Sequence, residues 1–397
     1  MDKEEKMKAL KMSWYEIKKV LRNRAVLILT LIVPIILAFL GSSFYPTDLV
    51  QNFQLALYNQ DNSLLGNIAF LLIKQFLNFE NTLEIKNEEQ LQQVIMQSKY
   101  DSIVIIPKGF TNDLVNRRQT TLYIVPNPHK IQNSMMIYTA FKAVFDELAG
   151  IPEIKVGSTT DFLAGGGIGI DETRPKPEIK MLIPSLDDGS LVVSSSTNLG
   201  INDMFAPLVA VVAILLLSMI GIAYTFGQSR EVGLLDLYIS NGLKLRDFVF
   251  SKLIAYIIMG FLAGLFSWYM FRLFGVHSQA APWNLILLIL VSVFAFSTFG
   301  LFLSSFLKTA KASSFLVTAM IGVMFIFGGI LIPIPDGSFL QYMANIFPIK
   351  YSLDAWRKLT VLGYGLFQIS NEIIILLCFG IAFLLGSILF VKTTQET

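Results

Sequence analysis

The stretch MFAPLVAVVAILLLSMIGIAYTFG, residues 204–227, carries no charged side chain. About 20 apolar residues in a helix span the hydrocarbon core of a bilayer, where only a continuous helix or a closed barrel satisfies the backbone hydrogen bonds. Over the whole chain 54% of residues are hydrophobic and 15% are charged, and the mean hydropathy is +0.60. This composition excludes an ordinary soluble enzyme and predicts an integral membrane protein.

Further apolar runs on both sides of this stretch predict more helices of the same kind. The six expected transmembrane helices cover residues 25–45, 204–227, 253–276, 283–307, 312–334 and 373–391. A long polar segment, residues 46–202, separates the first from the second. The expected fold class is therefore a membrane all-α bundle of six transmembrane helices, with helices 2–6 in residues 203–397 and an α/β extracytoplasmic domain inserted at residues 46–202.

The basic residues predict the orientation, because lysine and arginine in short loops stay on the cytoplasmic side. They gather before the first span, after the second and after the sixth: Lys3, Lys6, Lys8, Lys11, Lys18, Lys19, Arg22, Arg24, Arg230, Lys244, Arg246, Lys252 and Lys392. The opposite short loops hold Lys350, Arg357 and Lys358. Both termini are thus expected in the cytoplasm, with the protein multi-pass in a plasma or inner cell membrane.

Residues 1–24 have the pattern of an amphipathic helix. Leu10, Trp14, Ile17 and Leu21 recur at helical spacing, while lysines and arginines fall on another face. Such a segment is expected to lie in the cytoplasmic membrane interface. The alternative is a basic flank that serves only to orient the first span.

The segment 46–202 alternates short β-rich runs with helical ones, which is typical of an α/β domain. The expected strands are 53–58, 82–85, 101–106 and 121–125, and the expected helices are 64–79, 88–97, 110–117 and 131–148. Residues 150–200 contain three consecutive glycines, Gly165 to Gly167, and several prolines. This last stretch is expected to be loop or short strands.

Catalytic and metal-binding patterns are not evident in the sequence. The glycines Gly165 to Gly169 match neither GxxxxGK[ST] nor GxGxxG, and His129 and His277 have no neighbouring ligands at metal-binding spacing. No catalytic residue, metal ligand or cofactor is therefore predicted for this chain. Within the six runs Arg272 is the one charge expected, so uphill transport would need energy supplied through the soluble loops by a partner.

Three stretches resemble the permease subunits of ABC-2 type (type V) ABC exporters, in the subgroup with a large outer domain between the first two spans. The loop Ser229–Leu237 is similar to the family's E-R-E-x-G-T loop, with Arg230, Glu231 and Gly233 matching and Ser229 and Leu234 departing. The segment from Phe347 through Arg357 is similar to the family's outer segment after span five. Ile103–Phe110 resembles a strand and turn of the outer domain. The likeness covers nearly the whole chain.

The resemblance implies that the cytoplasmic loop 228–252 contacts a nucleotide-binding subunit. The residues expected to couple to that ATPase are Arg230, Glu231, Gly233, Leu234, Leu235 and Tyr238, with the two leucines and the tyrosine exposed. An alternative from the residues alone is a helix lying on lipid headgroups. An outer re-entrant segment is expected at 335–370, with Pro348, Tyr351 and Arg357 as its marker residues.

The expected function is that of a membrane-spanning permease subunit of an ATP-driven exporter for a lipophilic or amphipathic substrate such as a drug, peptide or lipid. The expected partners are a cytoplasmic ABC ATPase, which would bind ATP and Mg, and a second permease copy or homologue, with no nucleic acid. Three alternatives stay open: a sodium-type ion exporter permease, a membrane sensor with an extracytoplasmic ligand domain, and, ranked last, a polytopic membrane enzyme.

Overall fold

The computed structural model describes most of the chain in two compact units. The residues it describes are 14, 15, 17, 18, 53–61, 81–116, 118–150, 178–184, 191–193, 201–242, 244–273, 278, 280–328 and 339–396. One unit is Tyr45–Leu199, and the other combines Met1–Phe44 with Gly200–Thr397. Each unit is described below by itself.

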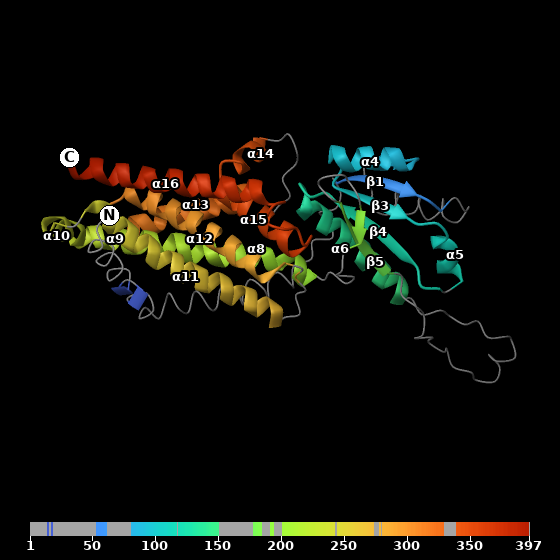
Figure 1. Ribbon diagram of the computed structural model, residues 1–397, viewed down its shortest axis with the longest axis horizontal. Coiled ribbons are helices and arrows are strands. Elements are labelled where there is room, and N and C mark those ends of the chain that lie inside the picture. Colours follow the sequence, from blue (N-terminus) through green and yellow to red (C-terminus); the bar gives the residue numbers. More distant parts are fainter. Residues whose placement is uncertain are drawn as a thin grey trace. The chain divides into compact units, whose positions relative to one another are not determined.

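The first unit is built on a mixed β-sheet (Figure 1). Its strands are β1 (Gln54–Asn59), β2 (Asn81–Ile85), β3 (Ser102–Ile106), β4 (Thr121–Pro126), β5 (Glu178–Pro184) and β6 (Leu191–Val193). The strand order is β2-β1-β3-β4-β5-β6. β1 pairs in parallel with β2 and β3, β4 pairs in parallel with β5, and the β3–β4 and β5–β6 pairs are antiparallel.

The helices of this unit are α4 (Glu88–Gln97), α5 (Phe110–Val115) and α6 (Ile131–Gly150). Asn87 caps α4, because its side chain accepts a hydrogen bond from the backbone N–H of Gln90 at 2.9 Å. Leu91, Val94 and Ile95 of α4 then pack in one cluster with residues of β1, β2, β3 and β4. Since side chains alternate between the faces of a strand, the neighbouring buried residues Leu55 and Val104 belong to the opposite face.

Most of the sequence prediction for this unit is confirmed within the described residues. The four expected strands and the helices expected at 88–97, 110–117 and 131–148 are present, with shifts of one or two residues at their ends. The helix expected at 64–79 lies outside the described residues. Within the Gly- and Pro-rich stretch 150–200 the structure describes β5 and β6, which extend the sheet by two strands.

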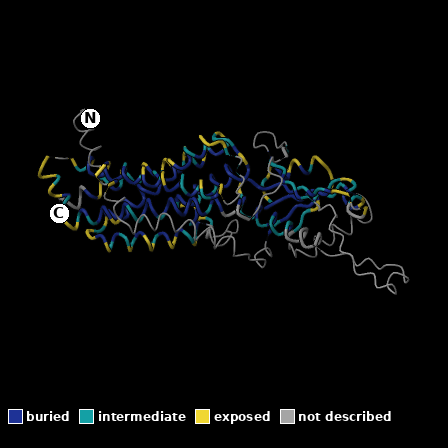
Figure 2. The backbone as a smooth tube through the Cα atoms, turned by 90° about the horizontal axis from the view of Figure 1, so that it is seen from below, coloured by how far each residue is buried: buried dark blue, intermediate teal, exposed yellow. Residues whose placement is uncertain are grey.

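The second unit is a helical bundle (Figure 1). Its helices are α8 (Ile201–Leu215), the π-helical η2 (Leu216–Ile220), α9 (Gly221–Glu231), α10 (Leu234–Ser240), α11 (Leu245–Leu273), α12 (Pro282–Ser305), α13 (Ala310–Phe327), α14 (Phe339–Ala344), α15 (Pro348–Thr360) and α16 (Ser370–Glu396). Figure 2 shows buried positions running through the interior of these helices. The core there is dominated by large apolar residues such as Tyr256, Phe226 and Trp356, each with 1% or less of its surface exposed.

Among the described residues, five helices are long and apolar enough to cross a membrane. They are Ala206–Glu231, Leu245–Leu273, Pro282–Ser305, Ala310–Phe327 and Ser370–Val391. They correspond to the second to sixth predicted spans, so these five are confirmed as apolar helices. The first predicted span, 25–45, lies outside the described residues, and the count of six is therefore not confirmed. The helix of the third predicted span, Leu245–Leu273, begins eight residues before the predicted start at Leu253, because polar residues form its first turns.

Candidate functional site

The loop that resembles the ATPase-contacting loop of ABC-2 permeases forms a short helix between two long ones. α9 ends at Glu231, α10 covers Leu234–Ser240, and α11 begins at Leu245. Gly233 has φ of 70° and Gly242 has φ of 80°, both in the left-handed region that favours glycine. The two glycines therefore allow the chain to reverse sharply at each end of α10, so that α10 is joined to α9 and α11 by only a few residues.

The exposed apolar side chains of this loop differ from those expected from the sequence. Leu235 is 3% exposed and packs in one cluster with Phe226 and Phe248. Tyr238 is half-buried, with its ring centroid 5.8 Å from that of Phe248. Residues three apart lie on one side of a helix, so Leu235 and Tyr238 together turn inward. The expectation that Leu235 is exposed is wrong, and Leu234 is also half-buried.

The apolar residues that α10 and its preceding turn present outward are Val232, Leu237 and Ile239. Their exposed fractions are 73%, 57% and 37%. We call these three residues the docking face, which extends around more than one side of α10 because Leu237 and Ile239 are two positions apart. They are the functional candidates that sequence reasoning missed, because the letters alone do not tell which side of a seven-residue helix packs on the bundle.

Arg230 lies at the last turn of α9 and points at the end of a different helix. Its Nη1 donates to the backbone oxygen of Ser305 at 2.7 Å and to that of Leu307 at 3.2 Å. These carbonyls close the C-terminal end of α12, where the helix dipole leaves partial negative charge. A cation at such an end stabilises it by about 0.3–1 kcal/mol.

Glu231 makes the complementary contact on the next helix. Its Oε2 accepts a hydrogen bond from the backbone N–H of Ala310 at 2.9 Å. Ala310 is the first residue of α13, where unpaired N–H groups favour an anion. Thr309 caps the same helix by accepting from the N–H of Ala312 at 3.3 Å. Arg230 and Glu231 thus hold the two sides of the α12–α13 turn, and we call them the turn clamp.

A glycine brings α9 close enough to α13 for the turn clamp to form. A Cβ atom placed on Gly227 would lie 2.7 Å from Ser313 Oγ and 2.8 Å from the backbone oxygen of Thr309. Contacts below 3.0 Å are not tolerated by real Cβ atoms, so the helices can approach this closely only because the residue is glycine. The end of α9 that precedes α10 is therefore packed directly on the start of α13.

The N-terminal segment contributes to the same region. Among its described residues Ile17 is 8% exposed and belongs to the cluster that contains Leu235. Trp14 and Tyr15 are exposed, and Lys18 Nζ lies 5.5 Å from the centroid of the Trp14 ring. The described residues 14, 15, 17 and 18 are helical, as the amphipathic pattern predicts.

The three marker residues of the predicted outer segment all lie on or at the start of α15. Pro348 is buried at its first turn, where the missing N–H costs nothing. The Tyr351 hydroxyl donates to the backbone oxygen of Asn345 at 3.1 Å. Arg357 is 9% exposed, and burial lowers its pKa to about 10, an effect that the Asp354 carboxylate opposes. α15 packs against α8, α12 and α16, so it is an integral part of the bundle.

Arg272 is the one charge within the predicted apolar runs, but the helices that contain these runs are longer and take in further charged residues. Lys252 of α11 is fully buried, with Nζ 3.5 Å from the backbone oxygen of Thr225 and 5.5 Å from the centroid of the Phe248 ring. Glu372 of α16 is 8% exposed and accepts from Lys358 Nζ at 2.6 Å. The helices begin before the apolar runs do, and so they take in charges that the sequence places in loops.

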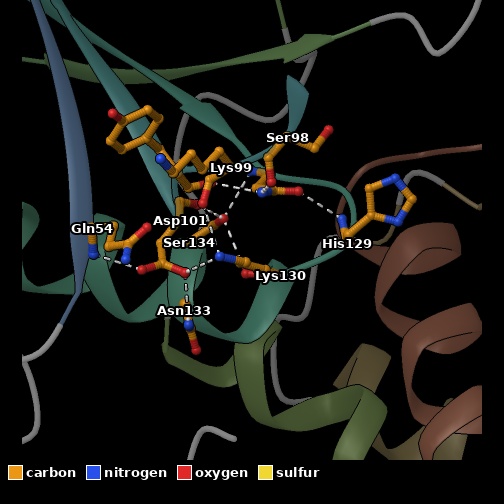
Figure 3. A network of polar contacts seen from close by, with 10 residues as sticks. Gln54, Ser98, Lys99, Asp101, His129, Lys130, Asn133 and Ser134 are labelled. Atoms are coloured by element: carbon orange, nitrogen blue, oxygen red, sulfur yellow. Dashed lines mark hydrogen bonds and ion pairs between the residues drawn. The ribbon is translucent and has the colours of Figure 1, made fainter. Parts of the chain in front are cut away.

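A polar network in the sheet unit holds the loop before β3 to the start of α6 (Figure 3). Asp101 accepts from the N–H of Gln54 at 2.7 Å and from Asn133 Nδ2 at 2.9 Å, and its carboxylate lies 3.5 Å from Lys130 Nζ. The Ser134 hydroxyl donates to the backbone oxygen of Asp101. Both carboxylate oxygens are therefore engaged by the protein itself, and we assign this network to stability.

The two units together define a class of protein: a multi-pass membrane protein with an inserted α/β domain. A family model described as "ABC-2 family transporter protein" matches residues 24–389 of the 397. The chain belongs to this family and is an ABC-2 transporter permease.

Solved structures also resemble part of the chain. The crystal structure of a domain of an ABC type-2 transporter from Thermotoga maritima MSB8 is similar to 36% of this chain, with 92% of that domain covered, 16% identity and a TM-score of 0.24. A search of curated proteins finds no match to the chain.

Proposed function

We propose that the chain is the membrane subunit of an ATP-driven exporter, in which a separate ATPase docks on α10. The observation that carries the proposal is the docking face. Leu237 and Ile239 on α10, and Val232 in the turn before it, expose apolar surface beside a junction of two long apolar helices. A partner seated there can move both helices together, because α10 also packs on the bundle through Leu235.

The need for an energy source supports a separate ATPase subunit as partner. Family membership implies an ATPase subunit in general, and the sequence contains no GxxxxGK[ST] phosphate-binding loop. The nucleotide and its Mg²⁺ would therefore bind the partner, and this chain would supply the path. We expect both termini and α10 to face the cytoplasm, in a plasma or inner membrane.

The exposed surfaces of two helices support a second permease copy, or a homologue, as a further partner of this chain. In the most apolar 18 residues of α13 and α16, only 28% and 17% of positions are buried, against 78% for the span formed by α8, η2 and α9. Two helices are thus largely uncovered in a single chain, as helices that face lipid or a second subunit are. We propose that the path between two such chains is apolar and takes a lipophilic or amphipathic substrate.

The docking face is tested by co-purification of the full chain with its ATPase. Leu237→Asp should abolish capture of the ATPase, because it places an unpaired charge in an apolar interface. The control Met96→Asp makes the same change at a residue of α4 that is 60% exposed and belongs to the sheet unit. Equal capture by both variants would exclude α10 as the ATPase contact and favour a helix that lies on lipid headgroups.

The topology is tested by single cysteines in a Cys378→Ser background. Met96→Cys and Asn241→Cys are both exposed positions, one on α4 and one after α10. A membrane-impermeant maleimide applied to intact cells should label position 96 and leave position 241 unlabelled. Labelling of both from the same side would overturn the orientation. Screening of transported lipophilic compounds in vesicles that contain both subunits then identifies the substrate.

A further inference from the structure

We propose that Arg230 and Glu231 are positioning residues that carry the movement of α10 into α13, rather than contacts to the ATPase. The inference rests on the proposed function, because it needs a partner that moves α10. It assigns to the turn clamp a mechanical role: the end of α9 pulls on the turn between α12 and α13, and α13 responds.

The directions of the hydrogen bonds support this role. The guanidinium of Arg230 points at carbonyls of Ser305 and Leu307, and the carboxylate of Glu231 points at the N–H of Ala310. Each charge meets the helix end of opposite polarity. Both groups therefore bind backbone atoms of the same chain, so a displacement of the end of α9 acts directly on the facing ends of α12 and α13.

The position of the clamp along the chain also supports it. Glu231 is directly followed by Val232 of the docking face, and Gly233 begins the turn into α10. On the other side Gly227 packs against Ser313 and Thr309. The docking face is thus adjacent in sequence to the clamp, so a displacement of one reaches the other directly. The contact at Gly227 holds α9 against α13.

The two helices that the clamp holds differ in how much of their surface the rest of the chain covers. In the most apolar 18 residues of α12, 72% of positions are buried, compared with 28% in α13. The outward face of α13 is a continuous stripe: Lys311, Phe315, Thr318, Ala319, Gly322, Val323 and Ile326. Because α12 is fixed in the bundle and α13 is covered on one side only, a pull on their shared turn should displace α13.

A direct ATPase contact is the competing explanation, and the choice of substitutions separates the two. Glu231→Gln keeps an oxygen that can accept from the N–H of Ala310, whereas Glu231→Ala removes it. A clamp should therefore survive Gln better than Ala. A salt bridge to a cation of the ATPase would be lost equally in both variants. Arg230→Lys likewise keeps a charged donor near the carbonyls, and Arg230→Ala does not.

The experiment uses the full chain with its ATPase in lipid vesicles, and it needs no substrate. A bimane fluorophore on Ile326→Cys, in a Cys378→Ser background, reports the environment of the exposed face of α13. The emission shift on adding ATP and vanadate is measured beside capture of the ATPase. The matched control is Arg272→Gln, which removes a charge from an exposed residue at the opposite end of α11, outside the loop 228–252.

In Glu231→Ala and Arg230→Ala we expect capture of the ATPase to stay within about twofold of the parent protein, a change below 0.5 kcal/mol. The nucleotide-dependent shift should fall by roughly 2- to 30-fold, the range seen for residues along a coupling route. Glu231→Gln, Arg230→Lys and Arg272→Gln should keep most of the shift, which also shows that the clamp position tolerates substitution without loss of the fold.

Three other results overturn the proposal. Loss of capture in both Glu231→Ala and Glu231→Gln would assign the carboxylate to the ATPase interface and leave the proposed function intact. An undiminished shift in both Ala variants would show that α13 moves without the clamp. If the parent protein itself captures no ATPase, the proposed function fails and the clamp inference fails with it.

Discussion

The charged side chains of the helical unit have different partners near α10 and near α15, which lie toward opposite ends of the bundle in Figure 1. At the end near α10, Arg230 and Glu231 bind backbone groups of the α12–α13 turn, and the Glu231 residue remains exposed. At the end near α15, Lys358 and Glu372 bind each other, and their side chains are 6% and 10% exposed. The first arrangement fastens a turn, and the second fastens two helices across a loop.

The difference predicts which end can move. A charge whose own side chain is partly in contact with solvent can exchange its backbone partner for water at smaller cost, whereas separating a buried ion pair leaves two charges without solvent. Lys358 lies in the last turn of α15 and Glu372 in the first turn of α16, so each also suits the dipole of its own helix. We therefore expect the α15–α16 end to be fixed while the α9–α13 end rearranges.

The largest predicted effect is at the fixed end. Lys358→Met leaves the Glu372 carboxylate buried without its partner and should lower the free energy of unfolding by about 3–5 kcal/mol. The double variant Lys358→Met with Glu372→Leu removes both charges and should recover most of that loss. Thermal unfolding of the detergent-solubilised chain measures both. Losses that simply add in the double variant would show that the pair is not coupled, and the contrast between the ends would fail.

A smaller effect is predicted for the packing at the movable end. Gly227→Ala forces a Cβ against Ser313 Oγ and the backbone of Thr309 and should cost about 1–3 kcal/mol. Gly322→Ala is the matched control on α13, since nothing lies within 4 Å of its Cβ position. There the better helix propensity of alanine should leave stability unchanged or slightly higher. Similar melting temperatures for the two variants would argue against close α9–α13 packing.

The helices and strands differ in how well the sequence predicts them. The charge-free run at 204–227 identifies a spanning helix from composition alone, and Asn87 before Glu88 predicts the start of α4 from capping chemistry. Both signals are local. For the stretch that holds β5 and β6 the sequence predicts only loop or short strands without positions, because its glycine and proline content is that of a loop, although β4 offers Ile179 and its neighbours a partner strand.

For the candidate site, the sequence indicates which loop to consider but not which residues its side chains contact. Its loop was located from the resemblance of residues 229–237 to a family motif, yet Arg230 meets Ser305 across 75 positions of sequence. No periodicity encodes such a pairing. The inward turn of Leu235 depends on the packing of Phe226 and Phe248 around it. Tertiary contacts thus decided which residues of the motif are exposed and which are fastened to the bundle.

The pH dependence of stability sharpens the comparison at the fixed end. Burial raises the pKa of the Asp354 carboxyl of α15, with Arg357, Lys350 and Lys358 opposing the shift and Glu372 adding to it. A carboxyl with a higher pKa in the folded protein contributes stability that is present below its unfolded pKa and is lost as the pH rises through the folded pKa.

Asp354→Asn should therefore flatten this part of the pH profile. The free-energy difference between the parent protein and the variant should change with pH by at most about 1.4 kcal/mol per pH unit. Melting temperatures between about pH 4 and pH 7 measure it, since the carboxyl begins to titrate near its ordinary value at the acidic limit. A difference that does not vary with pH would mean that Asp354 keeps its charge on folding without penalty.

The smallest predicted effect is at the turn clamp. Glu231→Gln keeps the acceptor for the N–H of Ala310 and loses only the interaction of the charge with the α13 dipole, about 0.3–1 kcal/mol. Thr309→Ala removes the neutral cap of the same helix and should cost about 0.5–2 kcal/mol. Thermal unfolding at low and high salt separates the two, because salt screens the charge and leaves the hydroxyl bond unaffected. If the cost of Glu231→Gln instead approached that of Lys358→Met and ignored salt, the carboxylate would be part of a rigid buried pair, and the α9–α13 end would be as fixed as the other.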